Sequence, residues 1–176
     1  EIGKTMVRSS AYLENNTPQG LGLKLISLEG ASGTRLSLAG RVGEVVTTTP
    51  ASAIQIAKGT VAKLTVDELA TGTKVQIDRG AEIKELNLDV AAQVAGDGDI
   101  KKLNVNTPGS TVTMLPEQIE LRPGINANIN GQQMDAAAAE EASRDPKLLS
   151  GYPIAVDVAP TSFSGSFAAN KKGTIY

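Results

Sequence analysis

Between residues 42 and 114 the chain repeats one pattern of apolar and polar positions about every twenty residues. Each unit opens with an apolar residue, continues with mostly polar positions, and then reaches a short stretch in which apolar and polar residues alternate. The unit openings at Val42, Val61, Ile83 and Ile100 are separated by 19, 22 and 17 residues. Because successive side chains of a strand point to opposite faces, this alternation gives each unit one inward apolar face.

Each unit also has a place for a second strand and a turn. The first strands carry the pairs Val45 and Thr47, Leu64 and Val66, Leu86 and Leu88, and Leu103 and Val105. The second strands carry Ile54 and Ile56, Val75 and Ile77, and Val112 and Met114, and Gly59, Gly80 and Gly98 close their units. A looser copy runs from Leu23 to Gly40. One such strand cannot bury its apolar face alone, so the period predicts a solenoid in which each repeat is one turn.

The predicted fold is therefore all-β: a short right-handed parallel β-helix of about four or five coils over residues 21–133. No apolar positions in the middle of the chain recur at the spacing of a helix, which argues against a helical domain. An antiparallel β-sandwich remains open as an alternative, since two short strands in twenty residues also suit that architecture.

The two ends of the chain need separate interpretations. Residues 1–20 are assigned to an N-terminal segment outside the coils. Residues 134–150 hold a short alanine-rich helix, which either covers the last coil or serves as a linker. Residues 151–176 contain C-terminal strands bounded by proline and glycine, and they predict the start of a further β-sandwich-like domain.

Composition removes several function classes. The chain has no histidine and no cysteine, which excludes serine–histidine and cysteine–histidine catalysis, thiolate zinc and disulfide scaffolds. A net charge of −2 with scattered basic residues argues against nucleic acid as a partner. Aromatic residues make up only 3% of the chain, fewer than sugar-stacking clefts usually need. No apolar run is long enough for a membrane span.

One acidic cluster is a candidate for metal binding. Asp97 and Asp99 alternate with Gly96 and Gly98, and Asp89 stands a few positions earlier. Carboxylate oxygens are the ligands that calcium prefers, so Asp97 and Asp99 form a calcium candidate. Aspartate and glycine are also the usual residues of a tight turn, and a turn is the simpler interpretation. No other cofactor is expected.

An enzyme on this fold would need a pair of carboxylates at a defined separation in a groove. The candidates fall at strand ends or outward positions without clustering, so no enzymatic activity is expected; they are Asp67, Glu68, Asp78, Glu82, Glu85 and Asp89. The run 47–50 is interpreted as an outward strand edge and loop. A binding module would use the longer loops 47–53 and 67–73.

Residues 100–114 (IKKLNVNTPGSTVTM) and 119–135 (IELRPGINANINGQQMD) resemble the β-helical segment of secreted bacterial proteins that carry S-layer homology motifs. Residues 156–176 are similar to the opening of the β-sandwich repeats that follow it in such proteins. The S-layer homology motif itself is absent from this sequence. The resemblance implies an extracellular structural module on the bacterial cell surface, a rigid spacer or assembly unit. Its implied partners are other domains of a longer polypeptide, further copies of itself, or cell-envelope components. An adhesin or polysaccharide-binding module is the alternative.

Overall fold

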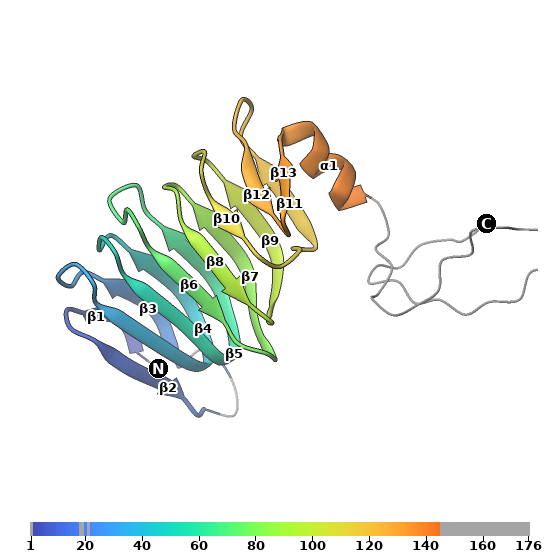
Figure 1. Ribbon diagram of the computed structural model, residues 1–176. Coiled ribbons are helices and arrows are strands. Elements are labelled where there is room, and N and C mark those ends of the chain that lie inside the picture. The colour runs from blue at the N-terminus through green and yellow to red at the C-terminus, as the bar shows by residue number, and fades with distance from the viewer. Residues whose placement is uncertain (1, 18–19, 21, 145–176) are drawn as a thin grey trace, which may run out of the picture.

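The computed structural model describes residues 2–17, 20 and 22–144. Of these residues 56% lie in strands and 6% in a helix, and the strands form a parallel β-solenoid of about seven turns. In Figure 1 the strands stack along one axis, with β1 and β2 at one end and the helix α1 beyond the last coil. The predicted all-β parallel β-helix is confirmed.

Two layers of parallel strands face each other across the core. Layer A contains β1 (Ile2–Val7), β3 (Leu23–Leu28), the second halves of β4 (Arg35–Thr47) and β5 (Ala53–Val66), β7 (Ala81–Leu88), β9 (Asp99–Val105) and β11 (Gln118–Leu121). Layer B contains β2 (Ala11–Asn15), the first halves of β4 and β5, β6 (Lys74–Ile77), β8 (Gln93–Gly96), β10 (Thr111–Val112) and β12 (Ala127–Ile129).

The strand register reproduces the repeat that the sequence predicts. Val42 pairs with Val61, Val61 with Ile83, and Ile83 with Ile100. The openings of the four units therefore lie in one column, although the units differ in length. The loops outside the ladder absorb these differences, so the inward residues keep the same phase from coil to coil.

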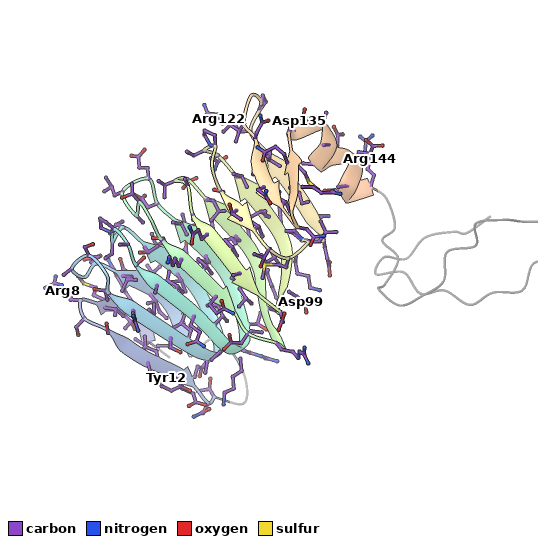
Figure 2. All side chains as sticks on the ribbon, in the orientation of Figure 1. Arg8, Tyr12, Asp99, Arg122, Asp135 and Arg144 are labelled. Atoms are coloured by element: carbon purple, nitrogen blue, oxygen red, sulfur yellow. The ribbon has the colours of Figure 1, made fainter. Side chains whose placement is uncertain are left out.

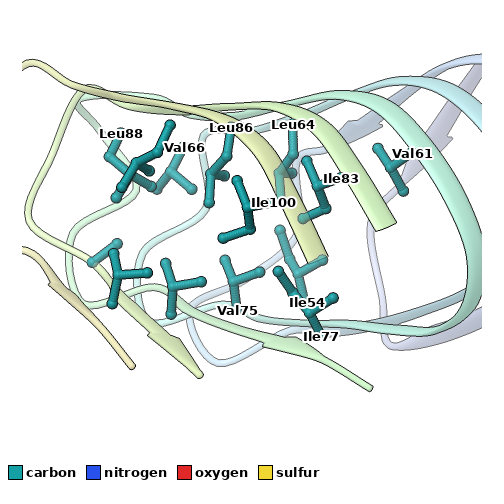
Figure 3. Packing of buried hydrophobic residues seen from close by; sticks show 14 of the residues in the cluster. Ile54, Val61, Leu64, Val66, Val75, Ile77, Ile83, Leu86, Leu88 and Ile100 are labelled. Carbon is teal, nitrogen blue, oxygen red and sulfur yellow. The ribbon is translucent and has the colours of Figure 1, made fainter. Parts of the chain in front are cut away.

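Aliphatic side chains fill the space between the layers. In Figure 3 one row of side chains, which includes Leu86 and Leu88, faces a second row that includes Val75 and Ile77. All four are at most 1% exposed. A buried leucine, isoleucine or valine contributes about 1.5–3 kcal/mol by leaving water, before the conformational entropy of the chain is subtracted. The stacked aliphatic columns thus make one continuous core.

The solenoid is longer than the four or five coils expected, because it begins at Ile2 rather than near residue 21. β1 runs parallel to β3, and β2 runs parallel to β4, so the segment 1–20 supplies the two strands of the first coil. The expected C-terminal strands in 151–176, and the end of the expected helix and linker at 145–150, lie outside the described residues.

At one corner two strands bend from layer B into layer A without a loop. β4 bends at Gly40 and β5 at Gly59, which have φ angles of +87° and +89°. A Cβ atom on Gly59 would lie 2.2 Å from the carbonyl oxygen of Gly40 in the coil below. Glycine is thus required here both for its backbone conformation and for the close approach of two main chains.

At the opposite corner the core is polar. The hydroxyl of Ser52 lies 3.2 Å from Thr47 Oγ1 and 2.9 Å from Thr73 Oγ1, and Thr73 Oγ1 donates a hydrogen bond to the carbonyl oxygen of Ala70. Thr47 and Thr49 are buried, so the interpretation of 47–50 as an outward edge is wrong for these two side chains. The reason is that both hydroxyls find partners at this corner, Thr47 with the hydroxyl of Ser52 and Thr49 with the carbonyl oxygen of Leu28, which makes an inward polar residue tolerable.

The last coil is covered on both layers. β13 (Gln132–Met134) pairs antiparallel with β12 in layer B, and α1 (Ala136–Arg144) packs against β11 in layer A. Asp135 caps the helix by accepting a hydrogen bond from the backbone N–H of Ala138. Ser143 Oγ accepts a hydrogen bond of 2.9 Å from the backbone N–H of Ile119. Of the two functions that the sequence left open for this helix, covering the last coil is the one observed.

Undocking α1 is expected to destabilise the last coil and promote association. Ala139 is fully buried against that coil, so Ala139→Asp places an unpaired charge there, at a cost of at least about 2 kcal/mol. The freed edge of β11 then becomes available for pairing with another chain. Light scattering at two protein concentrations measures the association. Ala137→Asp, on the exposed side of the helix, is the matched control, and equal behaviour of the two variants contradicts the prediction.

Candidate functional surfaces

The calcium candidates Asp97 and Asp99 lie at a corner between β8 and β9, and both are exposed. The backbone N–H groups of Asp97 and Gly98 both donate to the carbonyl oxygen of Ile77, which joins this two-residue connection to the preceding coil. Asp89 is not brought to it: it follows β7 at the opposite corner, where its Oδ1 accepts a hydrogen bond of 2.6 Å from Asn106. Within the described residues no three acidic groups converge as a metal site would need. The Asp97 and Asp99 site stays a prediction.

Five of the six carboxylates considered for catalysis contact neighbouring polar groups. Asp78 accepts a hydrogen bond of 2.7 Å from Gln55 Nε2, and Asp67 accepts one of 3.0 Å from the backbone N–H of Leu69. Glu82 lies 3.6 Å from Lys101 Nζ. These carboxylates therefore stabilise turns and join neighbouring coils.

The outer surface of layer A carries alternating charges in register. One column of paired positions reads Glu44, Lys63, Glu85 and Lys102 along four successive coils. Lys63 Nζ lies 4.0 Å from Glu85, and Lys102 Nζ lies 2.9 Å from Glu120. Opposite charges on facing positions of neighbouring strands favour this register over a slipped one.

A second cation on layer A is held more closely. Lys101 Nζ lies 2.5 Å from Glu117 and 3.6 Å from Glu82, so it bridges the coils on either side of its own. The hydrogen bond to Glu117 raises the pKa of Lys101 above its ordinary value. Asn104 Nδ2 on β9 also donates a hydrogen bond of 2.6 Å to Asn87 Oδ1 on β7. From β5 to β11, layer A therefore presents a polar surface on which most charged and amide groups bind one another.

Layer B has a different outer surface. A shallow hollow of about 750 Å³ lies over the first five coils of this layer, lined by small, amide and aliphatic groups. Its charged lining residues are Arg35 and Lys74, and no carboxylate is among the residues that line it. Both side chains are exposed, and within the described part of the chain neither forms an ion pair.

The aromatic ring at the N-terminal end of this hollow is held in place by charged neighbours. Tyr12, which is 57% exposed, projects from β2 at that end of the molecule (Figure 2). Its hydroxyl donates a hydrogen bond of 2.9 Å to Glu14 Oε2, and Glu14 Oε1 lies 2.8 Å from Lys58 Nζ. The hydrogen bond from Lys58 lowers the pKa of Glu14, and the hydrogen bond to Glu14 raises the pKa of Tyr12.

The loops proposed for binding are only partly available. In 47–53 the side chains of Thr47, Thr49 and Ser52 point into the corner, and in 67–73 Ala70 and Thr73 do the same. Leu69 is the exposed apolar group at the tip of the second loop. The more open surface is the hollow on layer B, which sequence reasoning did not identify. Comparing residues at the same position in each repeat would have identified the hollow, because Arg35 and Lys74 each stand at the start of a layer B strand.

Comparison of the chain with protein-family models, with curated proteins and with solved structures found no match. The described residues also contain no helix with the length and apolar character needed to cross a membrane.

Proposed function

We propose that this chain is an extracellular structural module of a bacterial cell-surface protein, in which it acts as a rigid spacer or assembly unit between other parts of a longer polypeptide. The observation that carries this proposal is the uninterrupted stack of about seven coils around one aliphatic core. Such a stack resists bending because every coil is joined to the next by ladder hydrogen bonds in both layers.

Two further features support a mechanical function. The charged groups of layer A are used to join neighbouring coils, as Lys101 does between Glu82 and Glu117. The covered C-terminal end and the polar outer surface of layer A limit unspecific association through that end and that face. The resemblance of residues 100–135 to segments of S-layer-type proteins supports the bacterial cell surface as the location.

The spacer function is tested by the distance between the two ends of the solenoid. Lys4 and Gln118 lie in one column, six strand pairings apart, so spin labels on Lys4→Cys and Gln118→Cys are expected about 29 Å apart plus the reach of the labels. The chain has no other cysteine, so labelling is specific. A single narrow distance distribution in pulsed electron paramagnetic resonance supports a rigid spacer. A broad or multiple distribution contradicts it.

The location is tested separately. Antibodies raised against the purified chain are expected to label intact cells of its source bacterium without permeabilisation. Labelling that requires permeabilised cells contradicts the cell-surface part of the proposal and leaves the spacer geometry unaffected.

A further inference from the structure

The outer surface of layer B contains two columns of residues that run along the solenoid axis. The first column holds Arg35, Ala53, Lys74 and Gln93, each paired in register with the next. The second column holds Tyr12, Ser37, Gln55, Gln76 and Ala95. The first column thus offers two cations and the second offers mainly amide and hydroxyl groups, and the two columns lie side by side over four coils.

The two cations of the first column lie on coils that are separated by one intervening coil. Arg35 and Lys74 are two strand spacings apart, which is about 9.6 Å, and the small side chain of Ala53 lies between them. One coil advances the surface by about the length of one sugar ring in an extended polysaccharide. Two coils therefore match a disaccharide, and a polymer with an acidic group on every second sugar would place a carboxylate beside each cation.

We propose that the hollow on layer B binds an extended acidic polysaccharide whose charge recurs on alternate sugars, lying along the solenoid axis. Arg35 and Lys74 bind the acidic groups, and Gln76 and Gln93 hydrogen-bond hydroxyls of the sugars. Tyr12, oriented by Glu14, packs against the face of a ring at the N-terminal end of the hollow. The proposed binding site is independent of the spacer function, so a negative result for polysaccharide binding would leave the spacer function unaffected.

Charge complementarity favours an acidic occupant over a neutral one. No carboxylate lines the hollow, and the two carboxylates that contact its lining residues are engaged, Glu14 with Tyr12 and Lys58, and Asp78 with Gln55. On layer A, by contrast, Lys63, Lys101 and Lys102 lie beside carboxylates. Cations that lack an internal partner are the ones available to an external anion.

The first test measures binding by isothermal titration calorimetry on the purified full chain. A hyaluronan octasaccharide, acidic at alternate sugars, is expected to bind, and chitohexaose, which is neutral, is not. Arg35→Gln combined with Lys74→Gln is expected to weaken hyaluronan binding at least tenfold. Lys84→Gln, an exposed lysine on layer A, is the matched control and should bind like the parent. No binding at millimolar ligand, or equal binding of both sugars, overturns the proposal.

The second test moves the charge to another coil. Ala53→Lys combined with Lys74→Gln places the two cations on adjacent coils, one strand spacing apart, and keeps the net charge. This variant is expected to prefer oligogalacturonate, which is acidic at every sugar, by several fold over hyaluronan, whereas the parent prefers hyaluronan. An unchanged preference contradicts the proposed match between coil spacing and sugar spacing. All of these positions point outward, so circular dichroism should show a fold like the parent's.

Discussion

Leu86→Asp is expected to unfold the solenoid under conditions in which the parent chain is folded. Leu86 is fully buried in the middle of an inward column, between Leu64 and Leu103 on the neighbouring coils. Removing a buried leucine side chain alone costs about 2–5 kcal/mol, and the buried carboxylate adds the cost of desolvating a charge without a partner. Together these costs rival the total stability of an ordinary domain, about 5–15 kcal/mol. Circular dichroism during urea titration measures the loss.

Lys84→Ala is the control for this experiment. Lys84 lies on the same strand, but its side chain is exposed, so its removal should change the free energy of unfolding by less than about 0.5 kcal/mol. If Leu86→Asp melted like the parent, the inward column would be assigned to the wrong face of the strand.

Gly59→Ala is expected to destabilise the chain by at least about 3 kcal/mol. The residue has a φ of +89°, and holding alanine in such a conformation costs about 1–3 kcal/mol. The added methyl group would also meet the main-chain oxygen of Gly40 at 2.2 Å. Because backbone cannot rotate away as a side chain can, the two coils must separate locally and lose ladder hydrogen bonds. The midpoint of urea unfolding measures the effect.

Gly80→Ala separates the two causes. Gly80 has a similar φ, +81°, but nothing lies within 4 Å of where its Cβ would stand. This variant should therefore show only the conformational cost, about 1–3 kcal/mol. Equal destabilisation of the two variants would mean that the close approach of Gly40 and Gly59 is unimportant.

The sequence was sufficient to predict the period, the strand type and the phase of the central coils. Val61, Ile83 and Ile100 could be aligned because each opens a unit and is followed, after two mostly polar residues, by a short alternating strand. The structure pairs them in the same register. In a solenoid the inward position recurs in every coil, so one alignment predicts both the fold and much of the core.

The first coil could not be predicted in this way, because among the described residues its two strands have a neighbour on one side alone. Ile2 and Met6 are exposed, and the inward position of β1 that pairs with Ile26 is occupied by a polar residue, Thr5. At the corner where β4 and β5 bend at a glycine, the first coil has Asn15, which pairs with Gly40. The repeat is thus least regular in the first coil, where fewer neighbours constrain the packing. The alternation of apolar and polar residues is too weak there to identify the strands.

The buried hydroxyls and the hollow on layer B were missed for a related reason. Thr47, Ser52 and Thr73 are inward although polar, because each finds a partner across the corner or in the next coil. Arg35 and Lys74 form one surface although 39 positions separate them in the sequence. Such relations depend on the three-dimensional register, which a scan for local polarity does not use.

The difference between the two ends of the solenoid has a consequence for how such a module can be lengthened. Among the described residues β1 and β2 each pair with one strand, so a duplicated coil inserted ahead of them would meet main-chain groups already in register. A coil inserted after β12 would first have to displace β13 and α1. Growth by duplication, in evolution or in design, is therefore expected to proceed toward the N-terminal side, with the last coil and its helix retained as a fixed terminus.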